Sequence, residues 1–140
     1  MIHQPVLLKE VLKIFNPKPN QNFIDATLGE GSHSIEILKK TAPKGKILGI
    51  EFDSVLIKEA EKNFKKFNLE KRVILVNDNF SNLEKIVKKN NFFDFEGILF
   101  DLGISKWHFK KSKRGFSFQK NEILDLRINP KFQTLKGFEI

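Results

Sequence analysis

The chain has 140 residues, no cysteine and a formal net charge of +8 at neutral pH. This length suits a single domain, and the lack of cysteine excludes disulfide bonds and thiolate metal sites. The excess of lysine and arginine favours a polyanionic partner. No uninterrupted apolar run reaches the roughly 20 residues that a membrane span needs. We therefore expect a cytoplasmic protein without a metal.

The N-terminal residues predict a short amphipathic helix. Residues 3–15 open with an extended His-Gln-Pro, and His3 is more simply a flexible terminal residue than part of a ligand site. Apolar residues then repeat at three- and four-residue spacing on one face: Leu7, Leu8, Val11, Leu12 and Phe15. Pro17 and Pro19 end this helix and lead into the first strand.

The most informative stretch runs from Asn22 to Ser34. It predicts a buried strand over residues 23–26, a turn with Gly29 and Gly31, and a helix with Ile35, Ile37 and Leu38 inside. Glycine lets a ligand approach the backbone, and the helix N-terminus offers unpaired N–H groups to an anion. This order of elements indicates a nucleotide-type cofactor site, although an ordinary strand-to-helix turn has the same pattern.

Residues 46–53 predict a second buried strand that ends in acidic residues. Glu51 follows Gly31 by about 20 residues, the interval at which an acid accepts hydrogen bonds from a ribose diol. The alternatives are a solvated strand-end carboxylate or, for Asp53, a helix N-cap. The next helix, residues 54–68, places these residues inward: Leu56, Ile57, Ala60, Phe64 and Phe67.

Two further strands complete the predicted sheet. Residues 72–76 form the third strand, and Phe80 after it either covers an adenine face or packs against its own helix, which presents Leu83, Ile86 and Val87. Residues 95–103 form the fourth, an apolar run typical of a parallel strand covered on both faces. Asp101 then lies at the ligand edge, where it could accept a substrate proton, orient a cofactor or cap a turn.

Right-handed crossovers between these strands predict the spatial order 3-2-1-4. This order leaves the fourth strand at an edge, where unpaired backbone invites association. We therefore expect either a homo-oligomer or a missing C-terminal half that covers this strand. By organisation, residues 1–20 are a lead-in, 21–103 hold the strand–helix units and 104–140 form a substrate-side loop segment.

Residues 104–140 lose the periodicity and mix cations with aromatic side chains. This mixture suits phosphate contacts and base stacking, while a solvated loop pinned by its aromatic residues has equal weight. Arg114 and Arg127 stand out in a chain where lysine is the usual cation. Arginine supplies a planar fork for bidentate contacts.

Four pieces of the sequence together resemble the RsmH/MraW family of S-adenosylmethionine-dependent methyltransferases, which act on cytosine N4 in small-subunit (16S) ribosomal RNA. The pieces are residues 3–10, 25–34, 100–105, and 114–118 with 124–130. The resemblance implies an α/β, Rossmann-like class I fold, truncated before the later strands and the inserted helical domain. It also implies S-adenosyl-L-methionine as the cofactor, the small ribosomal subunit as the partner and no membrane.

The resemblance also implies residue roles. In the turn with Gly29, the methionine end of the cofactor would contact Gly31, Ser32 and His33; Glu51 would bind the ribose, Phe80 the adenine, and Asp101 and His108 would complete the pocket. The family usually has glycine, aspartate and glutamine where this chain has Ser32, Glu51 and His108. Ser32 therefore needs a backbone conformation open to a residue with Cβ, and the ribose geometry of the longer Glu51 is in question.

The catalytic candidate is Asp101, as an acceptor for the cytosine amino N–H. For the RNA, the candidates are Arg114 and Arg127, or lysines, on phosphate, and Phe116 and Phe118 for stacking on a splayed cytosine. One alternative is a non-catalytic RNA-binding fragment of such an enzyme. A less favoured one is a fragment of an NAD-dependent dehydrogenase, in which Ser34 imitates the third small residue of the turn.

Overall fold

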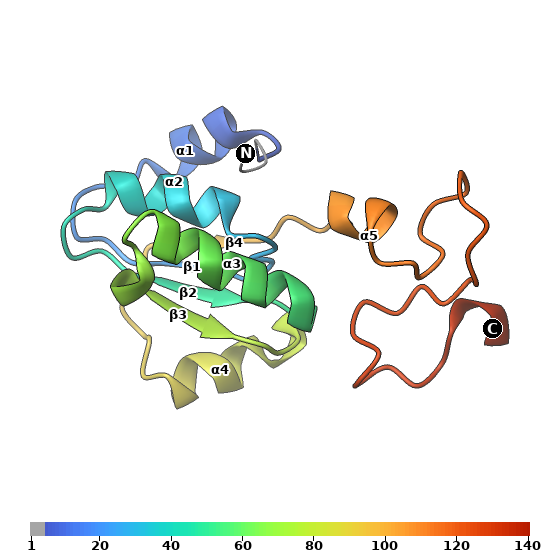
Figure 1. Ribbon diagram of the computed structural model, residues 1–140. Helices are drawn as coiled ribbons and strands as arrows, with labels where there is room; N and C mark the ends of the chain where they lie inside the picture. Colours follow the sequence, from blue (N-terminus) through green and yellow to red (C-terminus); the bar gives the residue numbers. More distant parts are fainter. Residues whose placement is uncertain (1–4) are drawn as a thin grey trace. The chain divides into compact units, whose positions relative to one another are not determined.

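The computed structural model describes residues 5–140, which form a four-stranded parallel sheet, the helices around it and a loop-rich C-terminal segment (Figure 1). The strands are β1 (Phe23–Asp25), β2 (Ile47–Ile50), β3 (Val73–Val76) and β4 (Ile98–Leu99). The α-helices are α1 (Leu8–Phe15), α2 (Ser32–Lys40), α3 (Ser54–Lys66), α4 (Leu83–Lys89) and α5 (Lys106–Lys110). Short 3-10 helices cover Glu70–Arg72, Phe80–Asn82 and Gly137–Glu139. The chain divides after Asp101 into two compact units.

The strand order β3-β2-β1-β4 confirms the predicted 3-2-1-4 arrangement. All pairs are parallel, and Phe23, Ile47 and Val73 are register partners across β1, β2 and β3. These strands therefore begin level with one another, and their arrows point the same way in Figure 1. The carboxyl ends of all four strands therefore lie along one end of the sheet, here called the carboxyl edge, and their amino ends lie along the opposite end, the amino edge.

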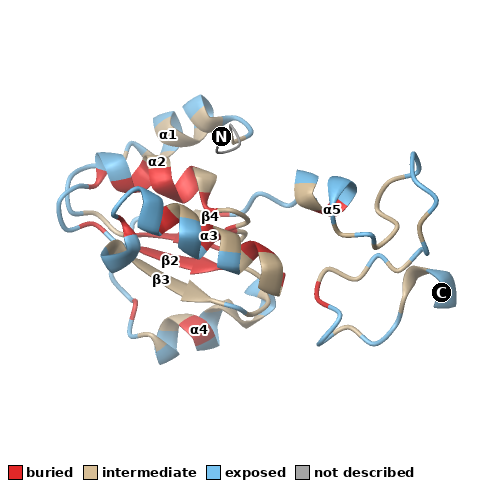
Figure 2. Ribbon diagram, viewed as in Figure 1, coloured by how far each residue is buried: buried red, intermediate tan, exposed pale blue. Residues whose placement is uncertain are grey.

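The two faces of the sheet have separate apolar cores. Phe23 and Ile47 point to the face covered by α2 and α3, where Leu38 and Phe64 are fully buried. Ile24 and Leu48 point to the opposite face, where Ile86 of α4 lies. This alternation follows from the period-two geometry of a strand. The two faces together bury β1 and β2 completely, as the red strands of Figure 2 show.

Two predicted core residues are wrong. Leu7 has φ 51° and is 65% exposed, because α1 begins only at Leu8 and packs on the core through Leu12 and Phe15. Phe67 caps the C-terminal end of α3, where it is partly exposed and the Lys39 ammonium lies 5.1 Å from its ring centroid. The predicted extended conformation of His3 and Gln4 lies outside the described residues.

The fourth strand is much shorter than predicted. Its last ladder bond joins the Ala26 N–H to the Leu99 carbonyl, because β1 then turns away into the glycine turn. Phe100 and Leu102 consequently lie outside the sheet and are 46% and 74% exposed, so the predicted apolar strand covered on both faces is wrong for this end. A second copy or further chain covering this edge stays a prediction.

The second unit, from Leu102 on, consists of α5, a 3-10 helix and irregular loops. Most of its residues are exposed or half-buried (Figure 2). Its buried polar residues are His108 and Asn129. Among the helices of residues 5–140, none has the length and apolar character that crossing a bilayer requires.

Candidate functional site

The turn after β1 contains two glycines with positive φ, 55° at Gly29 and 83° at Gly31. A Cβ added at Gly31, which caps α2, would lie 2.9 Å from the Phe64 ring, so the packing of α2 on α3 requires glycine there. A Cβ added at Gly29 would meet nothing within 4 Å. The backbone at Gly29 is therefore open for a ligand to approach.

Asp25 supports this turn through side-chain hydrogen bonds. Its carboxylate is buried and accepts hydrogen bonds from the Ser34 hydroxyl at 2.6 Å and the Thr27 N–H at 3.3 Å. Burial raises the pKa of Asp25, and the Ser34 hydrogen bond partly offsets this effect. Neither Asp25 nor Ser34 is predicted from the sequence as a support for the turn. The signal in the sequence is the single acid that ends the apolar strand residues Phe23 and Ile24.

Glu51 connects the end of β2 to the same turn. Its Oε2 accepts a hydrogen bond from the Gly29 N–H at 2.7 Å, and its Oε1 accepts one from the Asp53 N–H at 2.7 Å. Asp53 is the N-cap of α3 and accepts from the Val55 N–H, as one of the sequence alternatives predicted. The extra methylene of glutamate thus carries the carboxylate to the glycine turn.

Ser32 and His33 open α2. Ser32 is the first helical residue, and the positive φ falls on Gly31 instead, so the Cβ of Ser32 causes no backbone strain. The His33 ring is buried, and its Nε2 lies 2.8 Å from the carbonyl oxygen of Val6. This contact ties the segment before α1 to the start of α2.

Phe80 and Asp101 follow β3 and β4 at the same carboxyl edge. The Phe80 ring is 41% exposed and meets Phe100 edge to face, with 5.7 Å between centroids. Asp101 is exposed, and its backbone N–H donates to the Thr27 hydroxyl at 2.7 Å. With the open backbone at Gly29 and the Glu51 carboxylate, this edge fits a nucleoside cofactor: an aromatic face for a base, an acceptor for hydroxyls and room beside the turn.

His108, predicted to join the cofactor pocket, belongs to the second unit. It is buried between aromatic rings, with centroid distances of 5.3 Å to Trp107 and 5.0 Å to Phe116. Phe116 is half-buried by this packing, whereas Phe118 is 99% exposed. The two candidate stacking residues therefore differ, because only Phe118 presents its ring fully to solvent.

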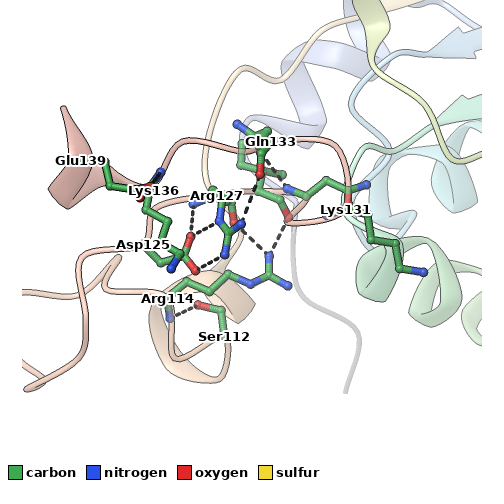
Figure 3. Close-up of polar contacts among 10 residues, drawn as sticks. Ser112, Arg114, Asp125, Arg127, Lys131, Gln133, Lys136 and Glu139 are labelled. Atoms are coloured by element: carbon green, nitrogen blue, oxygen red, sulfur yellow. Dashed lines mark hydrogen bonds and ion pairs between the residues drawn. The ribbon is translucent and has the colours of Figure 1, made fainter.

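The predicted RNA-binding arginines make contacts within the second unit (Figure 3). The Arg114 guanidinium donates to the carbonyls of Arg127 and Ile128 and lies 5.2 Å from the Trp107 ring centroid. Arg127 binds Asp125 through two hydrogen bonds of 2.6 and 2.9 Å, which lower the pKa of Asp125. Both arginines thus hold loops together, and a phosphate role for them stays a prediction.

Comparisons with known proteins point to one family. The sequence profile of the MraW methylase family matches residues 1–139. The chain is 42% identical over 129 residues to ribosomal RNA small subunit methyltransferase H of Dictyoglomus thermophilum, and 39% identical over 127 residues to that of Acetivibrio thermocellus. Each match covers 91% of this chain but only 43% and 41% of the relatives, so the chain spans about two fifths of their length.

Among solved structures, the chain is similar to an S-adenosylmethionine-dependent O-methyltransferase from Thermotoga maritima. The TM-score is 0.53 with 23% identity, over 59% of this chain and 31% of the other, and this likeness supports the fold alone. The family match spans the glycine turn, the strand-end carboxylates and the arginine segment together, and it leaves the dehydrogenase alternative without support. The chain belongs to the MraW methylase family.

Proposed function

We propose that this chain binds S-adenosyl-L-methionine at the carboxyl edge of its sheet and takes part in methylating the N4 amino group of a cytidine in small-subunit ribosomal RNA. The observation that carries the proposal is the meeting of an open glycine turn, a strand-end carboxylate and an exposed ring at that edge. The names of the relatives supply the ribosomal class of substrate.

Each part of the cofactor has a fitting group. Glu51 accepts hydrogen bonds from the ribose hydroxyls, because an ionised carboxylate has about four acceptor positions and two backbone N–H groups leave part of them available. The exposed ring of Phe80 covers the adenine, and the turn from Gly29 to His33 faces the methionine end. Glu51 also keeps the turn in shape by holding the Gly29 N–H.

The cofactor supplies an electrophilic methyl group. A cytosine amino nitrogen is a poor nucleophile, since its lone pair is delocalised into the ring. Asp101 is our candidate to accept a hydrogen bond from that amino group, which raises the electron density on nitrogen during the attack. Its main chain is fixed by the Thr27 hydroxyl, while its side chain is exposed. Alignment of the nitrogen with the methyl group provides much of the remaining gain.

Residues 104–140 are assigned to the RNA. Because Arg114 and Arg127 bind groups of their own unit, exposed lysines such as Lys111 and Lys113 are the better phosphate ligands. Phe118 is the better stacking residue, because its ring is exposed whereas Phe116 packs on His108. Unpaired bases stack on such exposed rings. A cytoplasmic location follows from this substrate as part of the proposal.

Two measurements test this function. Calorimetry is expected to show heat on adding S-adenosylhomocysteine and none on adding NADH. Tritiated methyl groups from S-adenosylmethionine are expected to enter undermethylated small ribosomal subunits. Asp101→Asn is expected to lower this incorporation while S-adenosylhomocysteine still binds; a parallel loss of binding would make Asp101 a cofactor contact instead of a catalytic residue.

A second candidate function is RNA binding without catalysis. It is favoured by one observation: both oxygens of the Glu51 carboxylate already accept backbone hydrogen bonds, which compete with a ribose for this group. Binding of the small subunit without methyl incorporation would select this candidate.

A further inference from the structure

The segments at the two ends of β1, β2 and β3 carry opposite charge, whereas the segment that leads into β4, residues 91–97, carries Asp94 and Glu96 and no cation. The segments that follow β1, β2 and β3, residues 26–34, 51–55 and 77–82, contain acidic residues and no lysine or arginine. The segments that lead into the same strands, residues 16–22, 40–46 and 66–72, contain many cations and Glu70 as the sole acidic residue. In Figure 1 these leading segments lie at the tail end of the strand arrows.

The leading segments form one connected platform. The Arg72 guanidinium donates to the Gly45 carbonyl at 2.7 Å and to the Thr41 hydroxyl at 3.0 Å. The Asn20 side chain accepts from the Lys44 N–H, and the Asn22 side chain accepts from the Lys46 N–H. The backbone positions of the loops are thus fixed, while the ammonium groups take no part in these bonds.

Six exposed lysines lie in these segments, and four of them, Lys40, Lys44, Lys46 and Lys71, are here called the amino-edge lysines. All four are exposed, and within the described part of the chain none of them lies in an ion pair. Elsewhere in the first unit, lysines such as Lys39, Lys62 and Lys88 pair with a glutamate on their own helix. The amino-edge lysines are therefore a positive surface on a fixed frame, bordered by the acidic residues Glu70, Asp94 and Glu96.

We propose that the amino-edge lysines bind the sugar-phosphate backbone of RNA, as a second contact remote from the carboxyl edge of the sheet. The inference rests on the proposed function, since it takes the RNA substrate as the partner. Lysine contacts phosphate as a point charge and reads no sequence, so this surface holds a neighbouring stretch of the RNA and not the target cytidine. The acidic segments at the carboxyl edge by themselves repel a polyanion. A second contact at the amino edge therefore helps to hold the RNA in place.

The test is the salt dependence of RNA binding. The triple variant K44Q/K46Q/K71Q removes three charges but none of the backbone bonds of the platform. A matched control, K9Q/K58Q/K85Q, removes three exposed lysines from α1, α3 and α4. Binding of a labelled RNA hairpin from the small subunit is measured by filter retention between 50 and 200 mM KCl, after circular dichroism has shown that both variants are folded.

The amino-edge variant is expected to lower the slope of log K against log salt by about 2 to 3, from roughly 0.7 to 0.9 for each lost phosphate contact. The control is expected to change the slope by less than about 1. Equal slopes in the two variants, or RNA binding that neither variant affects, would overturn the proposal. Calorimetry with S-adenosylhomocysteine separates the two proposals. If the unmodified chain does not bind S-adenosylhomocysteine, the cofactor site is rejected. The salt slopes of RNA binding then still decide the amino-edge contact.

Discussion

The two units are held together by different means. In the first, apolar side chains fill both faces of a parallel sheet, and regular ladder and helix bonds satisfy the backbone. In the second, arginine side chains donate to backbone carbonyls across loops, while many large apolar side chains remain exposed. Burial therefore stabilises the sheet unit, whereas a few charge-assisted hydrogen bonds order the C-terminal loops.

Gly31→Ala is expected to destabilise the first unit more than any other substitution considered. The new methyl group would lie 2.9 Å from the Phe64 ring at a φ of 83°, so strain and overpacking add. We expect a loss of about 3 kcal/mol in the free energy of unfolding, from urea titrations. Gly29→Ala is the matched control, with positive φ but open space, and is expected to lose about 1 kcal/mol. Equal losses would contradict the role of Phe64.

Arg114→Met tests whether the hydrogen bonds of Arg114 order the second unit. It removes hydrogen bonds from a charged donor to the carbonyls of Arg127 and Ile128, each worth about 1.5–3 kcal/mol. Chymotrypsin is expected to cleave the variant faster in residues 102–140, while cleavage within the sheet is unchanged. Lys113→Met, at an exposed position of the same unit, serves as the control. Faster cleavage in both units would mean that they unfold together.

Glu51→Ala addresses the function of the first unit alone. Loss of the carboxylate removes the acceptor for the ribose and the support of the Gly29 N–H. Calorimetry is expected to show S-adenosylhomocysteine binding weakened by about tenfold or more, with RNA binding within about twofold of the unmodified chain. Glu84→Ala on α4 is the control and is expected to leave both affinities unchanged. A parallel loss of both affinities would remove Glu51 from the ribose role.

The smallest expected effect is a pH dependence from Asp25. Burial raises the pKa of Asp25, so the folded state keeps this proton when the unfolded chain has already lost it. The stability that Asp25 contributes is therefore full below the unfolded pKa and is lost as the pH rises through the folded one. Urea titrations from pH 4 to 7 are expected to show the unmodified chain losing stability relative to Asp25→Asn. A constant difference would contradict the raised pKa.

The sequence predicted the parts of the fold that depend on local pattern. The apolar strands around Ile24 and Leu48 and the helices over them are periodic, so the order of the sheet followed from crossover handedness. The end of β4 was wrong because the partner strand stops at Asp25, which no pattern within residues 95–103 reveals. Local sequence also gives no sign of a bond between residues far apart in the chain.

The same limit applies to the site. Gly29, Glu51, Phe80 and Asp101 were placed at one edge because the carboxyl ends of parallel strands meet there. The bonds from Ser34 to Asp25 and from Gly29 to Glu51 depend on side-chain direction and on one methylene of length. In the second unit, the contacts of Arg114 and Arg127 join loops without periodicity, so their partners could not be read from spacing.

The most direct test of cofactor binding at the carboxyl edge is a nuclear magnetic resonance titration of the ¹⁵N-labelled chain with S-adenosylhomocysteine. The amides of Gly29, Gly31 and Asp101, at the carboxyl edge, are expected to shift, while the amide of Gly45 at the amino edge stays unchanged. Saturable shifts confined to the carboxyl edge would support the account. No shifts at any concentration, or shifts centred on Gly45, would contradict it.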